Sequence, residues 1–183
     1  DMHGDMIEKE LEPRPQVSFP AEVALNALDA RLASCGVTTA YASVSFTAGA
    51  SAGARRSYEH TSEVIRALYA AKPRLKVDHR IHARFDITLG DALEVIRELI
   101  DMGAVDLVSL MDHTPGQGQY RNIERFVKQI AYMRGVDDAE ARGIVDQKIK
   151  DRARPAEVIT ATLRAMSELC RSHAIPMASH DDD

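Results

Sequence analysis

The chain of 183 residues has few aromatic side chains and few cysteines. Aromatic residues make up 5% of it and tryptophan is absent, which argues against the stacking platforms of single-stranded nucleic-acid binders. The net charge of -5 also argues against a general nucleic-acid partner. Cys35 and Cys170 have no Cys-x-x-Cys spacing, so neither a zinc knuckle nor a disulfide framework is indicated. We therefore expect a reduced, cytoplasmic setting.

Long apolar runs and nucleophile motifs are also missing. No run approaches the ~20 apolar residues that cross a bilayer, so no membrane partner is expected. There is no Gly-x-Ser-x-Gly elbow, and neither cysteine follows a predicted strand, so catalysis by a Ser or Cys nucleophile is unsupported. The chain begins at Asp1 without Met and ends at Asp183 directly after a predicted strand, so we expect both ends to be cut.

What the sequence does contain is an alternation of strands and helices. Strands are predicted to start near residues 1, 37, 75, 105 and 174. The first helix is predicted between Pro20 and Gly36, because Pro favours the first turn and Gly the position after the last. A second helix is predicted over 57–71, and a third opens at a capping box formed by Thr88 and Asp91. The apolar faces of the first two helices are predicted to include Val23, Leu25, Leu28 and Leu32, then Val64, Ile65, Leu68 and Tyr69.

This order predicts an α/β fold with parallel strands. A doubly wound sheet would need a Gly-rich turn after the first strand, and Gly116-Gln-Gly118 has Arg121 where a third Gly would stand. A (β/α)8 barrel of the TIM type is therefore favoured. Such barrels run to about 250 residues, so residues 1–183 would form its N-terminal part, about five of the eight units. Residues 112–154 are predicted to be a long loop and helical insertion.

The third predicted strand, 75–87, separates apolar from ionisable residues. Its side chains alternate between two faces. One face is mostly apolar and includes His79, which we expect to be packed. The other carries, in order, Asp78, Arg80, His82, Arg84 and Asp86. In a barrel this charged row points inward, where burial is costly unless the charges pair or bind an ion. An exposed edge strand with a solvated face is the alternative.

Further polar residues stand at the ends of the other predicted strands. His3 and Asp5 lie two apart at the end of the first, so both point to one face, and His180 follows the last. Imidazole and carboxylate groups in this position suit zinc or a similar divalent ion. Polar surface turns are the alternative. The loop after residue 111 is rich in amides and glycine, so it either wraps anionic oxygens or is a plain connection; its candidate residues are His113, Gln117, Gln119 and Arg121.

Four segments together resemble the amidohydrolase superfamily, and more closely its phosphonate-metabolism branch. They are DMHGDMIEKELEPRPQVSFP, VDHRIHARFDI, VSLMDHTPGQGQY and ASHDDD. The resemblance implies a site for one or two divalent metal ions, zinc first, with manganese or iron as alternatives. Its ligands here would be His3, Asp5, Asp86 and His180, with His82, Arg84, His113, Gln117, Gln119 and Arg121 binding substrate. The family generally has Glu where this chain has Asp86, and the shorter side chain puts a bridging role in doubt.

The resemblance also implies an activity. It is hydrolysis of the triphosphate of a ribose 1-alkylphosphonate 5-triphosphate, with release of pyrophosphate, in phosphonate catabolism. The general base, the remaining ligands and a flanking β-sandwich would lie outside residues 1–183, so the chain alone is expected to be inactive. Two alternatives stay open: an amidohydrolase that cleaves a C–N bond, and a non-catalytic phosphate-binding fragment. The expected partner is a phosphorylated small molecule, and homo-oligomerisation is left open.

Overall fold

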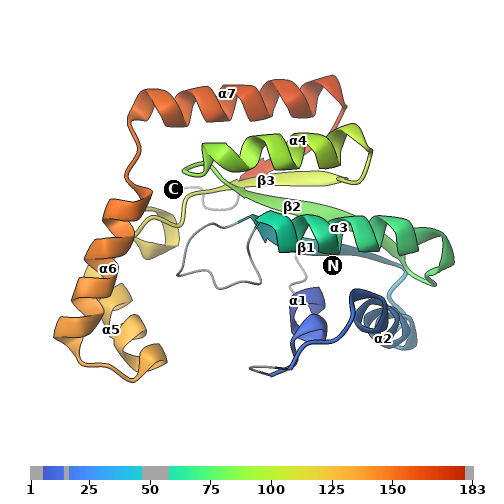
Figure 1. Cartoon of the computed structure of the whole chain (residues 1–183), viewed down its shortest axis with the longest axis horizontal. Helices are drawn as coiled ribbons and strands as arrows, with labels where there is room; N and C mark the ends of the chain where they lie inside the picture. Colours follow the sequence, from blue (N-terminus) through green and yellow to red (C-terminus); the bar gives the residue numbers. More distant parts are fainter. Residues whose placement is uncertain (1–5, 15–16, 47–57, 180–183) are drawn as a thin grey trace.

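A four-stranded parallel sheet forms the centre of the molecule (Figure 1). The computed structural model describes residues 6–14, 17–46 and 58–179. The strands are β1 (Thr39–Phe46), β2 (Asp78–Asp86), β3 (Leu107–Met111) and β4 (Met177–Ser179), and they lie side by side in sequence order. The predicted α/β class with parallel strands is confirmed. The strand predicted at the start of the chain lies outside the described residues.

Helices follow the same order as the strands that they connect. The segments are α1 (Met6–Leu11), α2 (Ala21–Ser34), α3 (Tyr58–Ala71), α4 (Leu93–Asp101), α5 (Ile123–Arg134), α6 (Asp138–Arg152) and α7 (Ala156–Ser172). Helix α2 packs beside α3, α3 beside α4, and α4 beside α7. In Figure 1, α3, α4 and α7 run next to one another along the sheet, while α5 and α6 stand apart. No helix among the described residues is long and apolar enough to cross a membrane.

One apolar cluster joins the sheet to these helices. Ile81 and Phe85 of β2 are completely buried in it, as is Ile65 of α3. Burial of about 1.5–3 kcal/mol per large apolar side chain makes this cluster the main source of stability. The carboxylate of Asp29 on α2 adds a polar anchor, because it accepts hydrogen bonds from the backbone N–H groups of Lys76 (3.0 Å) and Val77 (2.9 Å).

Helices α5 and α6 form a hairpin with a small core of its own. Its buried residues are Phe126, Val127, Ile130, Ala141 and Val145, and they form a cluster separate from the main one. Each helix has a side-chain cap at its start: Asn122 accepts from the N–H of Arg125, and Asp137 from that of Glu140. Gly135 ends α5 with φ of 65°, a conformation that favours glycine. The insertion predicted over 112–154 is thus a loop followed by a helical hairpin.

Some sequence predictions about the helices are confirmed and others are wrong. Pro20 precedes α2 and Gly36 follows it, as predicted. However, Val23 is 52% exposed and Tyr69 37% exposed, because both lie on the solvent side of their helices. The capping box is also wrong: Thr88 donates its hydroxyl to Asp86, and a 3-10 turn over Gly90–Ala92 leads into α4. The short helix α1 was not predicted.

Candidate functional site

One face of the sheet is apolar and the other carries polar and charged side chains, as the alternation in the strand predicted over 75–87 indicates. Residues paired in register share a face, and on one of them His82 pairs with Ser43, and Arg84 with Ser45 and Ser109. Asp78 and Arg80 at the start of β2 are exposed, but the row becomes buried towards the carboxyl end of the strand. The buried polar members are Ser43, Ser45, His82, Arg84, Asp86 and Ser109. We name this set the polar face. The alternative of a wholly solvated edge strand is therefore wrong.

His82 and Ser109 contact each other across neighbouring strands. The Nε2 atom of His82 lies 2.8 Å from the Oγ atom of Ser109, and both side chains are buried. A buried imidazole held by a hydroxyl has a fixed ring orientation, which is what a group needs to bind or to transfer a proton to a ligand. On the opposite face, His79 is buried and bonded to Asp29, so it is packed as predicted.

Asp86 ends β2 and is completely buried. Its Oδ1 atom accepts hydrogen bonds from the hydroxyl of Thr88 (2.6 Å) and from the N–H of the same residue (3.1 Å). Its Oδ2 atom forms an ion pair with the guanidinium of Arg152, the last residue of α6. Burial of a lone carboxylate would be strongly unfavourable, so this pairing explains how the group is accommodated.

Tyr58, at the start of α3, lies in the electrostatic field of the same strand end. Its hydroxyl donates a hydrogen bond to Asp91 (3.1 Å). Burial, together with the negative charges of Asp91 and Asp86, raises the pKa of Tyr58 above its ordinary value, while Arg154 acts in the opposite direction. The phenol therefore stays protonated at physiological pH. A cluster of acidic, basic and phenolic groups thus surrounds the carboxyl end of β2.

The loop after β3 is stabilised by its own hydrogen bonds. The N–H of Gln117 donates to Thr114, and that of Gly116 to Tyr120. These two N–H groups are therefore already used within the loop. The ring of His113 contacts Tyr120 edge-on, with centroids 5.7 Å apart, and Tyr120 in turn packs on Phe126 of α5. The loop therefore joins the end of β3 to the hairpin. Gln117 is exposed, and the side chain of Gln119 is not among those described.

Two arginines gather at the start of α5. Arg121 and Arg125 line one hollow, together with Asn122 and Gln129, and both arginines are exposed. Guanidinium groups bind phosphate oxygens through paired N–H donors. Of the predicted phosphate-binding residues, Arg121 therefore has a surrounding that suits an anion. Arg125 of α5 lines the same hollow.

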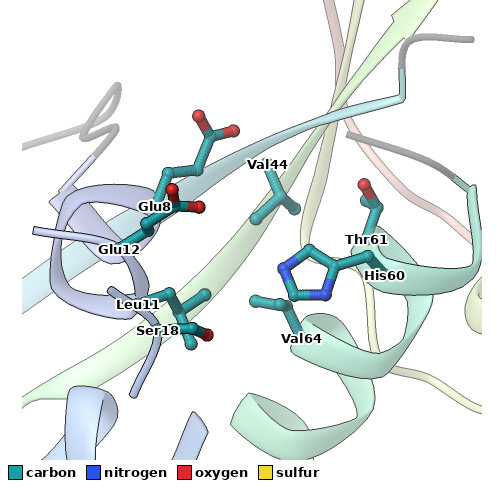
Figure 2. Close-up of a pocket in the computed structure, with 8 residues that line it drawn as sticks. All are labelled: Glu8, Leu11, Glu12, Ser18, Val44, His60, Thr61 and Val64. Carbon is teal, nitrogen blue, oxygen red and sulfur yellow. The ribbon is translucent and has the colours of Figure 1, made fainter. Parts of the chain in front are cut away.

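A second pocket lies on the opposite side of β1 from the polar face. In Figure 2, Glu8 of α1 and Glu12, which directly follows that helix, stand on one side of it, and His60 and Thr61 of α3 on the other. Val44 lines it and projects from the apolar face of β1, whereas Ser43 and Ser45 project from the polar face. His60, which the helix position predicts to be structural or exposed, is partly buried here.

The predicted metal site is only partly within the described residues. His3, Asp5 and His180 lie outside them, which leaves Asp86 as the predicted ligand whose surroundings are known. Within residues 6–14, 17–46 and 58–179, no three His, Cys, Asp or Glu side chains are grouped so that they could hold a metal ion. Asp86 has the right chemistry for a hard or borderline cation, but its carboxylate is already paired with Arg152. The described residues by themselves therefore do not form a metal centre, and the ligand set that includes His3, Asp5 and His180 stays a prediction.

Sequence reasoning missed two residues at this strand end, Arg152 and Tyr58. Both come from helices remote in the sequence, so no local spacing connects them with Asp86. The sequence pointed to Arg152 only indirectly. A buried carboxylate such as Asp86 needs a cationic partner, and the partner comes from the insertion that follows β3. Arg84 is buried on the predicted face.

Comparison with known proteins bears on what this arrangement does. Over 184 aligned residues, the chain is 30% identical to the alpha-D-ribose 1-methylphosphonate 5-triphosphate diphosphatase of Escherichia coli K12. The chain is therefore similar to that diphosphatase along its whole length. The alignment covers the whole chain and 47% of the E. coli protein, so the chain spans about half the length of this relative. No family model matches the chain, and no solved structure gives a significant match. The predicted resemblance to the phosphonate branch is confirmed.

Proposed function

We propose that this chain is part of a hydrolase of phosphonate metabolism that cleaves the triphosphate of a ribose 1-alkylphosphonate 5-triphosphate and releases pyrophosphate. The observation that carries the proposal is the similarity to the E. coli diphosphatase, which extends over all 183 residues. The buried polar row at the carboxyl ends of β2 and β3 supports it, because parallel α/β folds place their active sites at this edge.

The fold that we propose for the complete domain is a (β/α)8 barrel. In a doubly wound sheet the strand order reverses at a switch point and helices cover both faces. Here the strand order is β1-β2-β3-β4 without reversal, and the neighbouring helices α2, α3, α4 and α7 follow in the same sequence. That arrangement suits a curving barrel wall, with the polar face turned inwards and helices outside.

Several side chains of the polar face and of the loop after β3 would bind and orient the substrate. Arg84 on the polar face, and Arg121 beside Arg125 at the start of α5, are the cations that we assign to phosphate oxygens. His82, held by Ser109, would contact the substrate from the strand end, and His113, Gln117 and Gln119 from the loop. A divalent metal, held by His3, Asp5, Asp86 and His180, would supply an activated water near neutral pH.

An assay of the intact protein tests this proposal. Ribose 1-methylphosphonate 5-triphosphate should give one pyrophosphate for each substrate consumed, and activity should fall on removal of divalent metal with a chelator. A nucleoside amine and a cyclic amide serve as comparison substrates, because related metal sites cleave C–N bonds. Turnover of either without release of pyrophosphate would replace the proposal with an amidohydrolase. Retained binding of sugar phosphates without any turnover would indicate a non-catalytic module.

A further inference from the structure

The hollow at the start of α5 is connected to the polar face by a chain of contacts. Arg152, at the end of α6, forms an ion pair with Asp86 of the polar face. One turn earlier in α6, the ammonium group of Lys148 stands 5.5 Å from the centre of the Phe126 ring, and Phe126 lines the hollow. The start of α5 and the end of α6 therefore lie at the same end of the hairpin, beside the carboxyl end of β2.

The hollow combines cations with hydrogen-bond donors. It has a volume of about 770 Å³, and the described residues that line it are Gly118, Tyr120, Arg121, Asn122, Arg125, Phe126 and Gln129. None of these described residues is acidic. The next cation is close, because Lys148 contacts the Phe126 ring, and burial together with the charge of Arg152 lowers the pKa of Lys148. An anion in the hollow would therefore reduce the repulsion between these like charges.

Two guanidinium groups on one hollow suit a ligand with two adjacent phosphoryl groups. Arg121 precedes the N-cap residue Asn122 and Arg125 follows it, so the two arginines come from either side of the helix start. Each planar guanidinium can hold one phosphoryl group through parallel N–H donors. The side-chain amides of Asn122 and Gln129 have N–H groups for further oxygens. The positive end of the α5 dipole favours the same ligand charge.

We propose that this hollow binds the pyrophosphate end of a triphosphate, while the polar face holds the sugar end. In the hydrolysis, the oxygen of water joins the α-phosphorus, and the bond from that phosphorus to the bridging oxygen breaks. The bridging oxygen leaves with pyrophosphate, and a proton passes to solvent. The role in hydrolysis rests on the proposed function, whereas the affinity of the hollow for inorganic pyrophosphate does not. Released pyrophosphate then competes with the substrate for the hollow.

Titration calorimetry of the intact, metal-free protein with inorganic pyrophosphate tests the site. Arg125→Gln removes one guanidinium of the hollow and keeps the backbone N–H that Asn122 caps. Arg134→Gln is the control, because it removes the same charge from the last residue of the same helix, which is not among the residues that line the hollow. Arg125→Gln should weaken pyrophosphate binding about tenfold, and Arg134→Gln by less than about twofold. Equal affinity of Arg125→Gln and the unmodified protein would overturn the proposal.

Inorganic phosphate separates a pyrophosphate site from a general anion site. The unmodified protein should bind pyrophosphate at least about tenfold more tightly than phosphate, because the second phosphoryl group engages the second guanidinium. In Arg125→Gln the two affinities should lie closer together. Equal affinities for the two anions in the unmodified protein would mean that the hollow attracts negative charge without selecting pyrophosphate, and the proposal would be wrong.

Kinetics of the intact protein, followed through the ³¹P resonances of the triphosphate, test the role in hydrolysis. Arg125→Gln should raise KM and the inhibition constant of pyrophosphate about tenfold and leave kcat within about threefold, since binding rather than chemistry is weakened. If pyrophosphate binds as expected but no form hydrolyses the triphosphate, the proposed function fails and the hollow remains a pyrophosphate site. If hydrolysis proceeds with both constants unchanged in Arg125→Gln, the proposed function stands and the hollow is not its pyrophosphate site.

Arg125→Lys guards against a purely structural effect of the substitution. Lysine keeps the charge but loses the planar fork, so its pyrophosphate affinity should fall between those of the unmodified protein and Arg125→Gln. Circular dichroism checks that each variant is folded. An affinity of Arg125→Lys at or below that of Arg125→Gln would show that the charge at this position does not hold the anion, and it would overturn the proposal.

Discussion

The body of the molecule, which is the sheet with its neighbouring helices, is packed around one apolar cluster, whereas the α5–α6 hairpin contacts the sheet through an ion pair. In the body, a continuous apolar cluster joins the sheet to its helices. The hairpin has its own small cluster and reaches the strand end through Arg152 and Asp86. The difference indicates that the body and the hairpin are two separate packing units.

Phe85→Ala should give the largest loss of stability, because Phe85 is completely buried in the cluster of the body. We expect the free energy of unfolding to fall by about 3–5 kcal/mol, since both transfer energy and packing are lost. Urea denaturation followed by circular dichroism measures this. A loss below about 1 kcal/mol would show that the cluster is not the main source of stability.

Ile130→Ala tests whether the hairpin is energetically separate. Ile130 belongs to the hairpin cluster, and its truncation should cost about 2–3 kcal/mol there. Hydrogen exchange should quicken in α5 and α6, while the amides of β2 keep their protection. Equal loss of protection in both regions would mean that the body and the hairpin unfold as one unit.

Asp29→Asn removes a charged anchor from within the body. Burial by itself raises the pKa of Asp29, but the N–H groups of Val77 and Lys76 and the ring of His79 outweigh it and hold the pKa below its ordinary value. A lowered pKa in the folded state means that this stabilisation is present above the pKa of the unfolded state and is lost as the pH falls through the folded value. The variant should be less stable by about 2 kcal/mol at pH 7.

The dependence on pH checks the same prediction. The difference in unfolding free energy between the unmodified protein and Asp29→Asn should shrink as the pH falls below about 4, where the unfolded carboxyl group is protonated. Urea denaturation at a series of pH values measures it. A difference that stays constant down to pH 3 would contradict the assignment.

Tyr58→Phe should have the smallest effect. It deletes the hydrogen bond to Asp91 and should cost about 1 kcal/mol. Because the pKa of Tyr58 is raised, the phenol stays neutral and the cost should not vary between pH 6 and pH 9. Thermal unfolding at several pH values measures this. A cost that grows above pH 8 would show that the phenol ionises there.

The strands and the polar face were predictable from the sequence because both depend on local periodicity. The alternation of apolar and polar side chains from His79 to Asp86 can be seen in the sequence of β2 alone, and in the structure the polar side chains are buried towards the end of the strand. Pro20 and Gly36 marked the ends of α2 because their effect on the backbone is local.

Tertiary choices were not predictable in the same way. Thr88 could cap a helix or bond Asp86, and only the buried charge of Asp86 decides for the second. Val23 and Tyr69 match an apolar helix face by spacing, yet neighbouring elements do not cover them. The partnership of Asp86 with Arg152 joins positions 66 residues apart, so no short motif could contain it.

The most direct test of the polar face as the active site compares Asp86→Asn with Asp91→Asn in the pyrophosphate-release assay of the intact protein. Both substitutions remove one negative charge near the end of β2, but only Asp86 lies in the polar face. We predict that Asp86→Asn lowers kcat by about a hundredfold or more and that Asp91→Asn stays within about threefold, with both variants folded by circular dichroism. Equal activity of Asp86→Asn and the unmodified protein would contradict the account.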